Sequence, residues 1–374
     1  MPVTDRIALG CSVALGLVIA ALGPGTSAAA AEAESGIDVI EAGSAVIFTY
    51  HHVAEDTPES TSVKPDTFRA HLEHLEENDF HVWDLPRLLD ALQNGDAIPD
   101  KTVALTFDDA YQSVYDEVFP LMQERDWPFT VFVATDAVDR HAIYMDWDEL
   151  QELDDAGVTI ANHSVSHGHM ARPRPDEDRD DWLQRMEGEI VEAQDILEDK
   201  LDEPPRIFAW PYGESSPATR ELLRELDFVG LGQQSGAVAH YSHDFAALPR
   251  FPMAVGFAGV EDFALKARTR PLPVQETQPN DGVLEPDAEA PSLELTLIDG
   301  PYRADAINCF ARGASITREV TQQDPTMLRI QADGSLPVGR TTYTCTAPST
   351  SDDRWFWYSF TWMKPEADGS WYGW

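Results

Sequence analysis

Strand-like and helix-like segments alternate along residues 45–266 of this 374-residue chain, and this alternation constrains the fold more than any other feature. Apolar runs such as AVIFTYH (residues 45–51), VALTF (103–107) and PFTVFVAT (128–135) predict buried strands. Between such runs lie segments with apolar residues at helical spacing, for example residues 181–200. Repeated strand–helix units predict parallel strands with helices outside them, which is an α/β fold.

The first 31 residues predict a secretory signal peptide. Arg6, an apolar run over residues 7–22 and small residues at 27–31 follow the order of such signals. The run is short for a membrane span and is broken at residues 23–25, so cleavage is favoured over a retained anchor. No other segment is predicted to cross a membrane. We therefore expect an exported protein, in the periplasm, the cell envelope or the medium, without Cys11.

The pattern changes after residue 270. Residues 271–291 are rich in proline, acids and polar residues, which predicts a linker between the α/β domain (40–270) and the rest. Residues 292–374 contain short β-like runs with turn residues between them, which predict a small all-β domain of the sandwich type. Cys309 and Cys345 lie in this domain, and two cysteines in an exported chain predict one disulfide.

The chain is strongly acidic, with 66 Asp and Glu against 26 Lys and Arg and a formal net charge of -40. Such a charge indicates a soluble, solvated surface, as in a salty medium, and says little about the fold. Because an acidic chain repels phosphates, a nucleic-acid partner is disfavoured. A further hypothesis is that part of this negative charge lines a groove and attracts a positively charged polymer.

Two adjacent acids, Asp108 and Asp109, follow the strand predicted over residues 103–107. Functional groups of such folds gather at the carboxyl ends of the strands. Neighbouring carboxylates repel each other, and a bound cation offsets that repulsion. After another predicted strand, His163 and His167 are four residues apart, so one helical turn would bring both imidazoles to one side. Two His and one Asp supply three ligands and leave positions open for water and substrate, as in catalytic zinc sites.

TFDDAY, HSVSH and WPYG, in this order, resemble the motifs of the polysaccharide deacetylases with a NodB-homology domain, carbohydrate esterase family 4. The resemblance covers about residues 45–266 and implies an irregular (β/α) barrel. It also implies that Asp109, His163 and His167 bind one divalent metal, with zinc favoured and iron, cobalt or nickel as alternatives. Asp108 is then the general base that takes a proton from the attacking water.

The general acid departs from the common pattern of this family. Most members carry a histidine in an L-x-x-H motif after the last strand, and residues 228–267 contain no such motif. FTYHHV instead stands at the end of the first predicted strand, which resembles the permuted branch of exported poly-β-1,6-N-acetylglucosamine deacetylases. By that resemblance His51 is the general acid. His52 points the other way on a strand and is the alternative.

The third motif, FAWPYG, has alanine where many members have arginine. Trp210, Pro211 and Tyr212 are expected to form a groove wall for a sugar ring, with barrel packing as the alternative. A backbone N–H near Tyr212 is expected to stabilise the oxyanion. Arg250, in LPRFPM, is a candidate for the missing positive charge that orients Asp108, with a surface arginine as the equal alternative.

Near the C-terminus, RWFWYSFTW predicts an aromatic strand. Trp355 and Trp357 would lie on one face, with Phe356 and Trp362 on the other. We favour core packing or docking against the barrel for these side chains over glycan binding.

The leading hypothesis is a metal-dependent hydrolase that removes N-acetyl groups from a β-linked N-acetylglucosamine polysaccharide, which would be its partner. An O-acetyl esterase acting on an acetylated polysaccharide and a catalytically silent glycan-binding envelope protein are the alternatives. The four residues of the metal and base set argue against a silent protein. The sequence predicts neither a particular protein partner nor an oligomeric state.

Overall fold

An eight-stranded parallel sheet forms the first part of the computed structural model, which describes residues 43–241, 244–323 and 325–372. The strand order is β10-β1-β5-β6-β7-β8-β9, with β4 beside β5, and each pair in it is parallel. The strands are β1 (Ala45–Tyr50), β4 (His81–Val82), β5 (Thr102–Phe107), β6 (Thr130–Val133), β7 (Thr159–Asn162), β8 (Ile207–Ala209), β9 (Val229–Leu231) and β10 (Phe251–Pro252). The α/β prediction is confirmed, whereas the predicted signal peptide, residues 1–31, lies outside the described residues.

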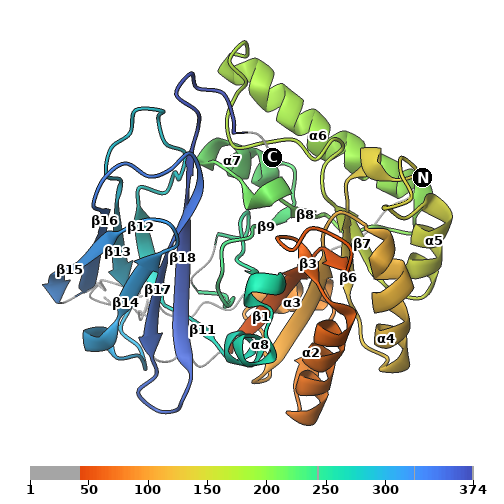
Figure 1. Ribbon diagram of the computed structural model, residues 1–374, viewed down its shortest axis with the longest axis horizontal. Helices are drawn as coiled ribbons and strands as arrows, with labels where there is room; N and C mark the ends of the chain where they lie inside the picture. The colour runs from red at the N-terminus through yellow and green to blue at the C-terminus, as the bar shows by residue number, and fades with distance from the viewer. Residues whose placement is uncertain (1–42, 242–243, 324, 373–374) are drawn as a thin grey trace, which may run out of the picture. The chain divides into compact units, whose positions relative to one another are not determined.

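Helices connect these strands and pack beside the sheet (Figure 1). They are α2 (Pro65–Glu77), α3 (Leu85–Asn94), α4 (Phe119–Glu124) with a preceding π-helical turn (Val114–Val118), α5 (Trp147–Asp155), α6 (Arg179–Lys200), α7 (Pro217–Glu225) and α8 (Val260–Ala267). Local sequence fixes several of their ends. Asp146 and Glu149 form a capping box that begins α5, and Gly95 ends α3 in the left-handed conformation.

The strands of this sheet are buried on both faces, which explains their continuous apolar sequences. All six residues of β1 are buried; Phe48 packs into one hydrophobic cluster and Ile47 into the other. The chain before β10 also forms a bridge between Leu248 and Leu231 of β9, at the opposite edge of the sheet. This segment therefore connects the two edges of the sheet, which agrees with the predicted irregular barrel.

Two four-stranded sheets make up the C-terminal part, in the orders β11-β18-β17-β14 and β12-β13-β16-β15. Their strands are β11 (Arg270–Pro271), β12 (Val274–Gln278), β13 (Ser292–Leu297), β14 (Asn308–Ala311), β15 (Ile316–Gln323), β16 (Thr326–Ala332), β17 (Gly339–Pro348) and β18 (Trp355–Lys364). Both sheets contribute to one hydrophobic cluster, so the all-β prediction is confirmed. A disulfide joins Cys309 of β14 to Cys345, its direct partner on β17, as predicted.

The all-β part begins earlier than the sequence indicated. Strands β11 and β12 include the first residues of the segment expected to be a linker, 271–291. Leu272 and Val274 supply the reason, because both are buried in the hydrophobic cluster of the C-terminal sheets. The contacts join the described residues into one unit, and the two-domain division of the chain stays a prediction.

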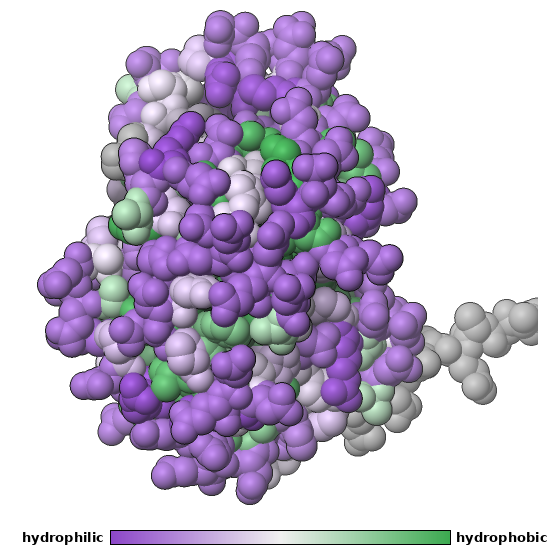
Figure 2. Space-filling model, turned by 90° about the vertical axis from the view of Figure 1, so that its right-hand side faces the viewer, coloured by the Kyte–Doolittle hydropathy of each residue, from purple (hydrophilic) through white to green (hydrophobic). Residues whose placement is uncertain are grey.

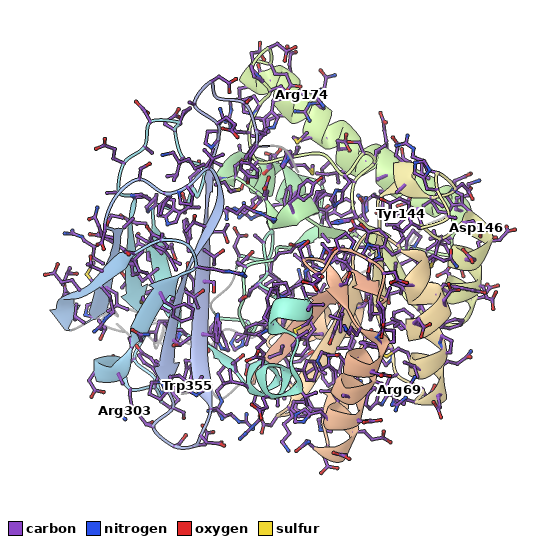
Figure 3. All side chains as sticks on the ribbon, viewed as in Figure 1. Arg69, Tyr144, Asp146, Arg174, Arg303 and Trp355 are labelled. Carbon is purple, nitrogen blue, oxygen red and sulfur yellow. A yellow bond between two sulfur atoms is a disulfide. The ribbon has the colours of Figure 1, made fainter. Side chains whose placement is uncertain are left out.

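The aromatic residues of β18 divide between two environments. Phe356 and Trp362 are buried within the C-terminal cluster. Trp357 faces the other way, and its ring meets the edge of Phe251 on β10 with 5.3 Å between ring centroids. Trp355, labelled in Figure 3, is 39% exposed at the start of the strand. This arrangement agrees with packing and docking as the main roles of these aromatic side chains.

The face drawn in Figure 2 is mostly hydrophilic, as the excess of charged residues predicts. Within the described ranges, none of the helices has the length and apolar character needed to cross a membrane.

Candidate active site

The two adjacent acids lie where β5 ends and the chain turns sharply. Asp109 has a φ of 73° and Ala110 a φ of 52°, so both adopt the left-handed conformation that residues other than glycine seldom take. Because of this turn, the carboxylates of Asp108 and Asp109 meet different partners. The repulsion between neighbouring acids is thereby offset on each side by a separate set of nitrogen atoms.

Asp109 faces the two histidines that follow β7. Its Oδ1 lies 3.4 Å from Nε2 of His163 and 3.1 Å from Nε2 of His167. One ligand atom from each of the three residues lies within 4.8 Å of the other two. The turn after β7 brings the histidines together, with His167 in the left-handed conformation and its N–H bonded to Ser164 Oγ.

The three residues fit a divalent metal. His163 Nδ1 lies 2.7 Å from the carbonyl oxygen of Ala209, which can only accept a hydrogen bond, so this nitrogen carries the proton. Nε2 of His163 therefore points its lone pair towards Asp109, and it is buried without a hydrogen-bond partner. Tetrahedral zinc with ordinary bond lengths separates its ligand atoms by about 3.3 Å.

Asp108 forms a buried two-point ion pair with Arg250. The distances are 2.7 Å from Nη1 to Oδ1 and 2.8 Å from Nη2 to Oδ2, and both side chains are fully buried. Arg250 Nε donates to Gly232 O at 2.8 Å, and Nη1 also donates to Thr106 Oγ1 at 3.1 Å. Gln233 Nε2 donates to Asp108 Oδ2 at 3.3 Å. Arg250 thus lies where the sequence placed the missing positive charge.

The environment keeps Asp108 ionised. Burial raises the pKa of its carboxyl, but the charges of Arg250, His163 and His51 together outweigh burial and lower the pKa to about 2. Near neutral pH Asp108 is therefore a carboxylate, able to accept a proton and unable to donate one.

His51 and His52 have different surroundings. His51 Nε2 lies 3.9 Å from Asp108 Oδ2, its side chain is 14% exposed, and it lines the cavity above the two acids. Burial lowers the pKa of His51, and the two acids only partly oppose this effect. His52 belongs to β2 (His52–Val53), which pairs with β3 (Ser62–Val63), and its ring stacks on Tyr111 at 3.5 Å. His52 is thus a packing residue by its contacts.

One cavity of about 880 Å³ opens over these groups. The barrel supplies His51, Asp109, Tyr111, Asp136, Arg140, Tyr144, His167 and Tyr212 to its lining, and the C-terminal sheets and their loops supply Arg312, Arg340, Thr342 and Thr361. Tyr144, labelled in Figure 3, stacks on Tyr111 with centroids 5.1 Å apart. Three arginines thus accompany two acids in the lining, which does not support the acidic groove suggested by the net charge.

A family comparison agrees with this geometry. Residues 95–231 match the family model described as polysaccharide deacetylase. The chain contains a polysaccharide deacetylase domain. It is homologous to the poly-beta-1,6-N-acetyl-D-glucosamine N-deacetylase of Escherichia coli K12, with 24% identity over 271 residues that cover 63% of this chain and 39% of that relative. The chain thus spans about two fifths of the length of this relative.

Solved structures show the same fold for the deacetylase domain. IcaB from Ammonifex degensii has a TM-score of 0.53 and 23% identity, covering 61% of this chain and 98% of that one. The Streptococcus pyogenes deacetylase PplD has a TM-score of 0.53 and 21% identity, covering 59% and 96%. At these identities the likeness establishes the NodB-type fold and no more.

Trp210 of the deacetylase domain differs from its expected place. Its side chain is fully buried, its indole N–H donates to Ala246 O at 2.7 Å, and it packs in the hydrophobic cluster beneath α6. Pro211 is buried as well. Of the expected groove wall, only Tyr212 lines the cavity, because its φ of 59° turns the chain there.

Sequence reasoning missed two residues in or behind the candidate active site. Gln233, which donates to Asp108, follows β9 without any motif around it. Glu214 follows WPYG directly and is fully buried, although no motif of its own marks it in the sequence. Position after a strand end was the available signal in both cases.

Proposed function

We propose that this protein is a metal-dependent N-deacetylase that acts on a β-linked N-acetylglucosamine polysaccharide. The observation that carries the proposal is the separation of roles between the adjacent acids. Asp108 is held as a carboxylate by Arg250, while Asp109 joins His163 and His167 in a set that fits a metal. Asp109 and His167 line one cavity together with His51, which lies 3.9 Å from Asp108, and the matched family and the named relative are deacetylases.

Asp109, His163 and His167 would hold the metal, with zinc favoured and iron, cobalt or nickel as alternatives. When bound, a divalent metal polarises the acetamide carbonyl and favours ionisation of a nearby water. Asp108 takes the proton from the attacking water, because its low pKa leaves it ionised and Arg250 holds it in place. The backbone N–H of Tyr212 stabilises the oxyanion of the tetrahedral intermediate.

His51 delivers a proton to the leaving amine. Burial lowers its pKa, so near neutral pH the imidazole begins the cycle neutral. It faces Asp108 at 3.9 Å, and the proton that Asp108 takes from water passes to His51 and then to the amine. One proton therefore moves from the water to the amine while the C–N bond breaks and acetic acid leaves, and the acid then gives its own proton to solvent to become acetate.

An exported location fits the same proposal. The disulfide between Cys309 and Cys345 forms and persists in oxidising compartments, where a cell-surface polysaccharide is also found.

Acetate release from N-acetylglucosamine oligomers tests the function. We would compare metal-stripped and metal-restored protein with Asp108→Asn, His51→Ala and the matched variant His52→Ala. Asp108→Asn and His51→Ala are expected to lower kcat by about 10²–10⁴-fold, the usual contribution of a general base or acid. His52→Ala is expected to retain most of its activity.

Other outcomes select among the alternatives. Activity that survives His51→Ala and disappears in His52→Ala moves the general acid to His52. Acetate release only from an O-acetylated polysaccharide favours the esterase. Metal binding without any turnover favours the glycan-binding protein.

A further inference from the structure

A second polar network lies behind Tyr212, centred on the fully buried carboxylate of Glu214. Glu214 Oε2 lies 2.7 Å from His169 Nδ1, and Oε1 accepts a hydrogen bond of 2.6 Å from the hydroxyl of Tyr372. Arg340 Nε of β17 lies 3.8 Å from Oε1. Two of these three partners therefore belong to the C-terminal part of the chain.

The same network holds Tyr212 from several sides. The ring of His169 stacks on Tyr212 at 4.7 Å and, on another side, on Trp371 at 5.1 Å. The ring of His167 meets Tyr212 edge-on at 4.5 Å. Arg340 Nη1 donates a hydrogen bond to the carbonyl oxygen of Tyr212.

Tyr212 needs such support because of its backbone. A φ of 59° is unfavourable for a residue with a side chain, and such a conformation persists only where the surroundings determine it. A buried carboxylate likewise needs donors or cations around it, and Tyr372 and Arg340 supply them to Glu214. If these contacts are lost, Glu214 and His169 are free to shift, and Tyr212 and His167 with them.

We propose that the C-terminal all-β part is a positioning element of the deacetylase centre. Tyr372 and Arg340 fix Glu214 and the backbone of Tyr212. Through them they hold the oxyanion donor and the imidazole of His167 in their working places. The inference rests on the proposed function for its catalytic consequence, and on the contacts alone for the placement of His167.

Tyr372→Phe is the sharpest test, because it removes one hydroxyl from the network. Tyr302→Phe is the matched control. It removes a hydroxyl that donates to Ile298 O at 2.8 Å within the C-terminal part, away from the site. Each full-length variant is assayed for kcat and KM on N-acetylglucosamine oligomers, for Co²⁺ affinity by titration of the metal-stripped protein, and for Tm.

Tyr372→Phe is expected to lower kcat by about tenfold with little change in KM, because a small misplacement of reacting groups acts on the transition state. Its Co²⁺ affinity is expected to fall several-fold, as when a group that orients a ligand is removed. Tyr302→Phe is expected to match the wild type in kcat and Co²⁺ affinity, with a comparable Tm. Arg340→Lys, which keeps a charge and a donor, is expected to retain more kcat than Arg340→Ala.

Several outcomes would overturn the proposal. In one, Tyr372→Phe equals Tyr302→Phe in kcat and Co²⁺ affinity. In another, KM for long oligomers rises while kcat stays constant, which would assign glycan binding to the C-terminal part. If the wild type releases no acetate, the proposed function fails, and the Co²⁺ titration alone decides whether Tyr372 positions His167.

Discussion

The barrel and the C-terminal sheets differ in how many charged and histidine side chains they bury. Within the described residues, the buried charged or histidine side chains of the barrel are His52, His71, Asp108, His163, Glu214 and Arg250, whereas the C-terminal sheets bury Lys364. The C-terminal sheets place ion pairs at the surface instead. Arg329 and Glu294, for example, form a pair on β16 and β13 whose side chains are 46% and 36% exposed.

The difference shows that the chain buries charged groups, at a cost in stability, mainly near the candidate active site. A buried polar group destabilises a fold unless it is paired, and a buried ion pair is weak evidence for stability. Asp108, His163, Glu214 and Arg250 all lie in or directly behind the candidate active site. The C-terminal sheets have an apolar core and a disulfide in place of such pairs.

Arg250→Gln should have the largest effect, since it leaves Asp108 buried without its charge partner. We expect the free energy of unfolding to fall by about 3–5 kcal/mol and acetate release to be nearly lost. Arg250→Lys should lie between the wild type and Arg250→Gln in stability and activity, because an ammonium keeps the charge but cannot make the two-point pair. Denaturant unfolding and the acetate assay measure both effects.

The double variant Asp108→Asn/Arg250→Gln sharpens this test. It removes both charges, so it should recover much of the stability lost in Arg250→Gln and none of the activity. An Arg250→Gln protein as stable as the wild type would contradict the comparison.

Removal of the disulfide should have the next largest effect, on the C-terminal sheets. Cys309 and Cys345 are separated by 36 residues, and loss of a cross-link of that span costs up to about 4 kcal/mol. Cys309→Ser/Cys345→Ser should therefore unfold at lower denaturant, while kcat under native conditions stays unchanged. Wild type treated with a reductant should behave in the same way, and equal stability of the reduced and oxidised proteins would argue against this role.

A pH effect should follow from His71, which is buried between α2 and α8. Its Nδ1 contacts the Tyr50 hydroxyl at 3.1 Å and its ring stacks on Phe263 at 4.1 Å. Burial lowers its pKa to about 4, against an ordinary 6.5, although the carbonyl of Ala258 opposes this. Between these two pH values the imidazole is therefore protonated in the unfolded chain and neutral in the folded protein. The stability due to the neutral imidazole is complete above pH 6.5 and is lost as the pH falls towards 4.

The size of that loss is about 3 kcal/mol for a shift of this kind. His71→Gln should lose less stability than wild type between about pH 7 and pH 4.5, as measured by denaturant unfolding. His81→Gln, a change on the exposed side of β4, is the matched control and should follow the wild type. Parallel pH dependence in all three proteins would count against His71.

Arg329→Gln should have the smallest effect. Because both members of its pair with Glu294 are well exposed and screened by solvent, we expect no measurable change in the free energy of unfolding. A loss as large as that of Arg250→Gln would break the contrast between the two parts of the molecule.

The sequence was most informative where the chemistry lies in short stretches. TFDD and HSVSH each place their functional residues within a few positions of a strand end, so strand alternation was enough to bring Asp109, His163 and His167 together. The placement of Arg250 beside Asp108 required a different argument, the search for a missing charge.

Other features depend on contacts that no local pattern encodes. The side chains of Trp210 and Tyr212 point to different places because Tyr212 adopts the left-handed conformation. The buried indole N–H of Trp210 donates to a carbonyl oxygen 36 positions away. The bond from Tyr372 to Glu214 spans 158 positions. The early start of the all-β part reflects Leu272 and Val274, two apolar residues in a segment rich in proline and polar residues.

The position of Arg250 in the chain also bears on how the protein is made. Its partner Asp108 precedes it by 142 residues, and β10 beside it pairs with β1, the first strand of the sheet. On the ribosome, β1, β5 and the acids emerge long before the guanidinium that neutralises Asp108. Until residue 250 has left the exit tunnel, the nascent domain has no charge partner for this carboxylate and no strand to cover the edge of β1. The candidate active site is therefore completed late in synthesis, and a chain that ends before that point would lack both the strand that pairs with β1 and the charge partner of Asp108.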